Sequence, residues 1–206
     1  MVQYKFTYGK ARGLGEPVRL LLHYAGVPFE DERIEFGQVQ EMRDELPFGQ
    51  IPLLTIDGAY KISQSRAILR YLARKYNLTG KDEIEEAKVD SYLDFLDDLA
   101  NNVRPYIMAL RGNGEDKDKK YEAAKTYIET KWEKFFNKTV DASGSGFISN
   151  SGLTYPDFVF ACFYETATKI NFEPIINMKN FKLIHDNVKS LPQLKEYLSS
   201  RPDSQF

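Results

Sequence analysis

Hydrophobic and polar residues alternate at the start of the chain. Val2, Tyr4, Phe6 and Tyr8 stand between polar neighbours, and a period of two is typical of a strand with one buried face. The spacing becomes helical over residues 16–25, where apolar side chains recur three and four positions apart. The chain therefore begins with a strand that ends at Tyr8, followed by a helix.

The segments up to residue 79 continue this mixture of strands and helices. Apolar patterning and turn residues predict strands over residues 29–34, 53–56 and 59–62, a short polar helix over 38–45, and a helix from Ser63 or Gln64 to about Tyr76. This order of elements is that of a thioredoxin-like domain. The chain has one cysteine and hence no Cys-x-x-Cys pair, which excludes dithiol redox catalysis.

Beyond residue 80 the pattern is helical throughout. Apolar spacing predicts helices over residues 82–110, 118–140, 181–189 and 193–199. Thr154 and Asp157 are spaced as a capping box and predict one more helix start between them. We therefore expect an α/β plus all-α fold, with a thioredoxin-like domain over residues 1–79 and an all-helical domain over residues 82–206.

Composition narrows the possible functions. The 206 residues include 28 Lys and Arg against 30 Asp and Glu, a net charge of −2 that gives no electrostatic footprint for nucleic acid. No apolar run is long enough to span a membrane or to form a signal peptide, so a cytoplasmic protein is expected. One cysteine and two histidines make a metal site improbable. Gly13-Leu14-Gly15 lacks the third glycine of a dinucleotide-binding loop.

Three features in the first 79 residues point to ligand chemistry. Pro52 enters an apolar strand where a cis proline would leave the Ile51 backbone free to pair with a peptide-like ligand. Gln64-Ser65 stands at a helix start, which attracts a carboxylate. Tyr8 places a phenol at a strand tip. Taken singly, these residues could be a turn former, a helix cap and a packed aromatic, but together they predict one binding site at one end of the sheet.

Seven segments that include these features match a known family in order and spacing. They are Tyr4-Lys5-Phe6-Thr7-Tyr8, Arg12-Gly13, the run from Leu46 to Pro52, Asp57-Gly58, Gln64-Ser65, Asp97-Asp98 and Thr154-x-x-Asp157. With them the chain resembles the sigma-class glutathione transferases, especially the invertebrate branch. The resemblance implies an enzyme that conjugates the glutathione thiolate to hydrophobic electrophiles, with glutathione as co-substrate and no metal.

The resemblance also implies roles for individual residues. Tyr8 looks like the catalytic tyrosine whose hydroxyl donates to the glutathione sulfur, and Asp98 like the acid that completes the site of the other subunit in a homodimer. The implied glutathione-binding residues are Tyr8, Arg43, Gln50, Ile51, Pro52, Gln64, Ser65 and Asp98. The implied hydrophobic pocket, between the two domains, consists of Gly9, Arg12, Leu14, Val103, Tyr106, Leu110 and Phe206.

Three positions depart from the family pattern. Val39 stands where many members have a tryptophan, Leu14 where the prostaglandin D isomerases of this class have an arginine, and Gly9 where a phenylalanine is common. A wider or more mobile second-substrate pocket is therefore expected beside Gly9. Two alternatives to conjugation remain open, which are glutathione-dependent isomerisation of prostaglandin H to D, and a non-catalytic carrier of haem or other hydrophobic ligands.

Overall fold

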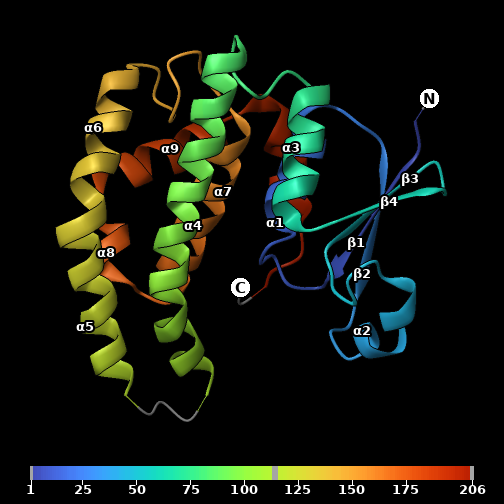
Figure 1. The fold of residues 1–206 in the computed structure, drawn as a ribbon, viewed down its shortest axis with the longest axis horizontal. Helices are drawn as coiled ribbons and strands as arrows, with labels where there is room; N and C mark the ends of the chain where they lie inside the picture. The colour runs from blue at the N-terminus through green and yellow to red at the C-terminus, as the bar shows by residue number, and fades with distance from the viewer. Residues whose placement is uncertain (1, 113–115, 205–206) are drawn as a thin grey trace. The chain divides into compact units, whose positions relative to one another are not determined.

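The computed structural model describes residues 2–112 and 116–204, and its contacts divide them into two compact units (Figure 1). The first unit contains the chain up to Leu78 together with the segment that begins at Lys189. The second unit is Thr79–Val188. Sequence analysis places the segment after Lys189 in the helical domain, whereas its contacts join it to the sheet-containing unit.

A four-stranded mixed sheet forms the centre of the first unit. Its strands, in the order β2-β1-β3-β4, are β1 (Tyr4–Gly9), β2 (Phe29–Ile34), β3 (Leu53–Ile56) and β4 (Tyr60–Ser63). β2 is parallel to β1, whereas β3 is antiparallel to both β1 and β4. Phe6 and Leu54 pair across β1 and β3 and are fully buried. The predicted thioredoxin-like order of elements is confirmed.

Short and medium helices complete the first unit. They are α1 (Glu16–Tyr24), α2 (Gln38–Glu41), the 3₁₀ turn η1 (Arg43–Glu45), α3 (Ser65–Lys75), the 3₁₀ turn η3 (Pro192–Leu194) and α10 (Lys195–Ser200). α1 contacts both α3 and η3, and Figure 1 shows α1 and α3 side by side with α2 apart from them. Leu20, Leu21 and Leu22 of α1 are buried, so this helix supplies much of the apolar core of the unit.

The second unit is entirely helical over its described residues. It contains α4 (Glu83–Arg111), α5 (Lys117–Tyr127), the π turn η2 (Ile128–Trp132), α6 (Glu133–Ser143), α7 (Tyr155–Lys169), α8 (Glu173–Ile176) and α9 (Lys179–Lys189). Trp132 lies at its centre, stacked on Phe136 and Phe181. The Trp132 indole N–H donates to the Phe95 carbonyl at 3.0 Å, so the one polar atom of this ring is satisfied inside an aromatic core.

Two helices differ from the expected ones. Residues 118–140 are predicted as one continuous helix, but the π turn at Ile128–Trp132 separates α5 from α6. The helix expected over residues 193–199 begins instead as the 3₁₀ turn η3 and continues as α10. The capping box is present as predicted, with Thr154 and Asp157 bonded to each other's backbone at the start of α7. Within the described ranges, no helix combines the length and the apolar character that a bilayer crossing requires.

Candidate active site

Tyr8 lies at the end of β1, where only Gly9 separates it from the loop of residues 10–15 that leads into α1. It is 7% exposed, and its hydroxyl oxygen accepts a hydrogen bond from the Leu14 N–H at 3.1 Å. The Phe36 ring meets the Tyr8 ring edge to face at 6.0 Å between centroids. The Arg19 guanidinium lies 5.8 Å from the centre of the Tyr8 ring. The phenol is therefore fixed by neighbours on several sides, with its oxygen already accepting one hydrogen bond.

Two glycines make this close approach possible. A Cβ atom on Gly13 would lie 2.7 Å from the Tyr8 hydroxyl oxygen, and one on Gly15 would lie 2.4 Å from Tyr8 Cδ1. Gly13 also has a φ of +37°, a conformation that other residues rarely adopt. In the sequence this Gly-x-Gly pair is considered only as a possible nucleotide-binding motif, whereas in the structure both glycines pack against Tyr8.

The space beside Gly9 is filled by an aromatic ring. A Cβ atom on Gly9 would lie 2.5 Å from Cζ of Phe36. Phe36 follows β2 and is half exposed. Phe36 is thus a neighbour of Gly9 that the sequence pattern does not indicate, because it comes from the segment after another strand. The pocket expected beside Gly9 stays a prediction.

Strand register brings three predicted site residues to one end of the sheet. Thr7 pairs with Leu53 in β3, and Leu53 pairs with Ser63 in β4. The next residues in the same direction are therefore Tyr8, Pro52 and Gln64. The Ile51–Pro52 peptide bond is cis, as predicted, and Ile51 is half-buried beside this end of the sheet. The predicted convergence of phenol, strand-like backbone and helix start agrees with this register.

The start of α3 has an unusual backbone conformation. Gln64 precedes the helix with φ at +73°, where few residues other than glycine are found. Ser65 opens the helix and is buried. Because the first N–H groups of a helix have no partner within it, they can bind an anion. Strain of this kind is often found at ligand-binding positions.

Arg43 and Gln50 lie in the segment between β2 and β3. Both are exposed, and the Arg43 side chain passes close to Gly49, where an added Cβ would lie 3.0 Å from its Cγ. Lys61 of β4 donates to the Glu45 carbonyl at 2.9 Å, which ties this segment to the sheet. A guanidinium and an amide group are thus available in the same unit as Tyr8 to bind the end of a ligand that lies away from Tyr8.

The remaining predicted residues lie on α4 in the second unit. Asp98 is exposed, Val103 and Tyr106 are buried, and Leu110 is half-buried. Tyr106 packs against Tyr121 and Phe172, with centroids 5.3 Å away in each case. Burial raises the pKa of Tyr106 above its ordinary value, so this phenol stays neutral. Phe206 lies outside the described residues.

Sequence analysis missed a set of buried ionic residues next to the Tyr8 loop. Arg19 donates to the Gly9 and Ala11 carbonyls at 3.3 Å each, and to Asp31 at 2.9 Å. Glu16 pairs with Arg201 at 2.7 Å between Oε1 and Nη1. Burial and the nearby Glu16 carboxylate raise the pKa of Tyr197, whose hydroxyl donates to Glu16 at 3.0 Å. Nothing local in the sequence signals a pairing across such a separation.

The described residues offer no metal centre. Outside residues 1, 113–115 and 205–206, the structure brings together no group of three or more histidine, cysteine or acidic side chains that could hold a metal ion.

Family models match most of the chain. Residues 5–74 match the N-terminal domain of glutathione S-transferase, and residues 97–201 match its C-terminal domain. The two matches fall on the two halves of the chain in the family's order.

Full-length relatives and solved structures agree with these matches. Glutathione S-transferase 3 of Caenorhabditis elegans is 38% identical over 100% of both chains. Glutathione S-transferase 1 of Ascaris suum is 35% identical with the same coverage. Among solved structures, NaGST-2 has a TM-score of 0.90 at 36% identity, and a Nu-class enzyme from Haemonchus contortus has 0.84 at 34%. Each of the two covers 100% of both chains. These matches show that the chain is an enzyme and that it belongs to the glutathione S-transferase family.

Proposed function

We propose that this glutathione S-transferase conjugates glutathione to hydrophobic electrophiles, and that the Tyr8 hydroxyl donates a hydrogen bond to the thiolate sulfur. The observation that carries the proposal is the placement of Tyr8. Its oxygen accepts from Leu14 N–H at 3.1 Å, at the end of the sheet where Pro52 and Gln64 follow the paired residues Leu53 and Ser63.

Thiol ionisation is the chemical step that this arrangement assists. A glutathione thiol resembles free cysteine, whose pKa is about 8.5, so most of it is protonated at neutral pH. A fixed donor at the sulfur stabilises the thiolate, which is the nucleophile. Because Tyr8 oxygen already accepts from Leu14, its own O–H is polarised and becomes a better donor. The thiol proton passes to solvent, and the thiolate sulfur forms a bond to the electrophilic carbon as a leaving group such as chloride departs, without a further acid or base.

Glutathione itself would lie along this end of the sheet. The Ile51 backbone would pair with the cysteinyl part as an added strand. Ser65 and Gln64, at the start of α3, would hold the γ-glutamyl carboxylate. Arg43 and Gln50 would bind the glycyl end, where a guanidinium can contact a carboxylate through two parallel hydrogen bonds. Pro52 would fix the direction of the Ile51 carbonyl.

A homodimer and the hydrophobic pocket are further parts of the proposal. Asp98 is exposed on α4 and would reach the γ-glutamyl amine bound by a second copy. One similar structure, Na-GST-3 of Necator americanus, is described as monomeric. Sedimentation of this protein with and without Asp98→Asn therefore tests whether it forms a dimer.

The candidates for contact with the electrophile are Gly9, Arg12, Leu14, Val103, Tyr106 and Leu110. A sigma-class assignment, a cytoplasmic location and a role in detoxification stay predictions.

Prostaglandin isomerisation is the second candidate. A structure titled prostaglandin synthase D of Nilaparvata lugens matches with a TM-score of 0.80 at 33% identity. The side chain of Leu14 is exposed and apolar at the position where isomerases of the class have an arginine, which favours conjugation. Incubation with prostaglandin H and glutathione would support isomerisation only if the D product forms faster than it does without enzyme.

The decisive experiment compares Tyr8→Phe with Tyr4→Phe. Tyr4 lies at the other end of the same strand, is equally buried and bonds to the Tyr76 hydroxyl at 3.3 Å, so it controls for the loss of a buried phenol. With a chloronitrobenzene as electrophile, Tyr8→Phe should lower kcat/KM about 10-fold to 1,000-fold while glutathione binding persists. Equal rates for the wild type and Tyr8→Phe would contradict the proposal. Binding of haem or other apolar ligands without turnover would favour the carrier.

A further inference from the structure

The loop of residues 10–15 carries the N–H group that bonds to Tyr8, yet it has no regular secondary structure. Its own backbone supplies one turn, in which the Arg12 carbonyl accepts from the N–H groups of Gly15 and Glu16 at 3.0 and 2.8 Å. The remaining order comes from outside the loop. Arg19 of α1 donates to the Gly9 and Ala11 carbonyls at 3.3 Å each and fixes the first half of the loop.

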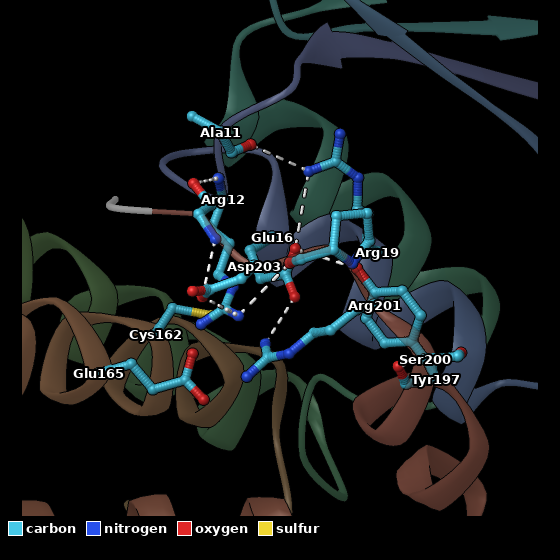
Figure 2. Close-up of polar contacts among 12 residues, drawn as sticks. Ala11, Arg12, Glu16, Arg19, Cys162, Glu165, Tyr197, Ser200, Arg201 and Asp203 are labelled. Atoms are coloured by element: carbon cyan, nitrogen blue, oxygen red, sulfur yellow. Dashed lines mark hydrogen bonds and ion pairs between the residues drawn. The ribbon is translucent and has the colours of Figure 1, made fainter.

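The second half of the loop is held by a segment almost 190 residues away in sequence. We call residues 201–204 the C-terminal strap. Arg12 N–H donates to the Ser204 hydroxyl at 3.3 Å, and Arg12 Nη2 donates to the Pro202 carbonyl at 3.5 Å and to Asp203 at 3.4 Å. Figure 2 shows Arg201 at the base of the strap, turned toward Glu16, with Asp203 beside Arg12.

Among the contacts of the described strap residues, the ion pair between Arg201 and Glu16 at the base of the strap is the most buried. Glu16 is 1% exposed and the Arg201 side chain 6%. Arg19, fully buried, lies 3.6 Å from the other oxygen of the same carboxylate. A buried ion pair is weak evidence for stability, because desolvation offsets most of the Coulomb attraction. Its directional geometry instead determines where the groups attached to it can lie.

We propose that Arg201 is a positioning residue for the reaction, which holds Glu16 and the C-terminal strap so that the Leu14 N–H points at the Tyr8 hydroxyl. The inference rests on the proposed role of Tyr8. Leu14 stands between two anchored residues: Arg12, which bonds to the C-terminal strap, and Glu16, which pairs with Arg201. A backbone shift of about one ångström would lengthen the Leu14–Tyr8 contact beyond hydrogen-bond distance. Tyr8 would then be a poorer donor, and less of the bound glutathione would be thiolate.

The test measures the ionisation of bound glutathione by the ultraviolet absorbance of the thiolate as pH is varied. Arg201→Met removes the charge at similar volume. Arg201→Lys keeps the charge but replaces the guanidinium, with its paired N–H donors, by an ammonium group. Lys182→Met is the matched control, since it breaks an exposed ion pair with Asp186 in the second unit. Arg201→Met should raise the apparent pKa of the bound thiol by about half a unit to one unit and lower kcat/KM about threefold to tenfold. Arg201→Lys should restore part of the loss, and Lys182→Met should change neither quantity.

A double-mutant cycle separates this inference from the proposed function. If Arg201 acts through Tyr8, Arg201→Met should have no further effect on the thiol pKa in a Tyr8→Phe background. An equal effect in both backgrounds, or an unchanged thiol pKa in Arg201→Met alone, overturns the positioning role while Tyr8 keeps its own. If Tyr8→Phe itself changes nothing, both proposals fail.

A milder variant covers the case in which Arg201→Met does not fold. Ser204→Ala removes only the hydroxyl that accepts from Arg12 N–H, and it should shift the thiol pKa in the same direction by a smaller amount. Hydrogen exchange of the Leu14 amide, followed by mass spectrometry, should be faster in Ser204→Ala than in wild type, since the loop loses one of its anchors. An amide that exchanges at the wild-type rate would contradict the mechanism.

Discussion

The two units bury their acidic side chains among different partners. In the first unit, Glu16 lies between the guanidinium groups of Arg19 and Arg201. In the second unit, Asp157 accepts from the N–H groups of Ile148 and Thr154 at 2.9 and 2.8 Å and from the Thr154 hydroxyl at 3.0 Å. Arg201 reaches Glu16 from a segment 185 residues away, and this contact can set the position of a loop. The donors to Asp157 lie within nine residues of it in the sequence and set where α7 begins.

A second helix start in the same unit repeats this local design. Asp82 accepts from the Glu85 N–H at 2.8 Å, and Glu85 accepts from the Lys81 N–H at 2.8 Å. Glu85 also accepts from Ser151 N–H at 3.2 Å and from the Ser149 hydroxyl. Asp82, Glu85 and Asp157 therefore serve the fold, whereas Glu16 lies within three residues of Leu14, whose N–H bonds to Tyr8. The comparison can be tested by changing each carboxylate or its surroundings.

The largest effect on stability should come from Asp157→Ala. The substitution removes three hydrogen bonds at a fully buried helix start, and we expect the free energy of unfolding to fall by about 2–4 kcal/mol. Urea unfolding measures the loss, and Asp118→Ala, which removes an exposed aspartate from α5, is the control. If the comparison is right, the thiol pKa of folded Asp157→Ala equals that of wild type. A shifted thiol pKa would break the division between the two units.

Gly15→Ala should have the next largest effect, and in the first unit. Its Cβ would lie 2.4 Å from Cδ1 of Tyr8, so the ring or the loop must move, at about 1–3 kcal/mol of unfolding free energy. Turnover should fall as well, since Tyr8 is displaced. Gly37→Ala is the matched control because nothing lies within 4 Å of the added atom. Wild-type turnover in Gly15→Ala would show that the position of Tyr8 tolerates change.

The pH dependence of stability should have opposite signs at the two helix starts. Hydrogen bonds from Ser149 and Lys81 lower the pKa of Glu85 to about 2, so its contribution is complete above about pH 5 and is lost as pH falls toward 2. Burial raises the pKa of Asp157 to about 7. As pH rises, Asp157 therefore loses its proton at a lower pH in the unfolded chain than in the folded protein. The free energy of unfolding falls for this reason as pH rises from about 4 to 7.

Glu85→Gln isolates the acid side of this profile. It should remove a loss of about 2–3 kcal/mol of unfolding free energy between pH 5 and 2, as measured by urea unfolding in a series of buffers. Glu86→Gln, one residue along the same helix, is the control. A profile for Glu85→Gln that still falls as steeply as wild type would assign the acid sensitivity to other carboxylates.

Much of the first unit follows from the sequence because its signals are local. The bounds of β2 and β3 agree with the strands expected over residues 29–34 and 53–56, and the Ile51–Pro52 bond is cis as its place before a strand indicates. β4 begins one residue later than expected. Asp57 and Gly58 both have positive φ, but Ile56 pairs with Tyr60, so Ala59 is a third loop residue. A shift of one residue exchanges the two faces of a strand, and turn residues alone do not fix it.

The misses in the second unit have physical reasons too. A π turn adds one residue to a helix without breaking its apolar spacing, so the pattern over residues 118–140 reads as continuous. α8 spans Glu173–Ile176 and is too short to show a period. In the candidate site, the Gly13 and Gly15 contacts with Tyr8 and the Arg201 pair depend on how distant segments meet, which periodicity cannot indicate.

The grouping of the segment after Lys189 with the first unit has a consequence for synthesis. A protein emerges from the ribosome in sequence order, and domains tend to fold as they emerge. Here the sheet can form once residue 78 has emerged, but Arg201 and Ser204 follow only after the whole helical unit has been made. A nascent chain can thus carry every proposed glutathione contact of the sheet and still lack the anchors of its tyrosine loop. On the proposals made above, full thiol activation arrives only after Ser204 has been made.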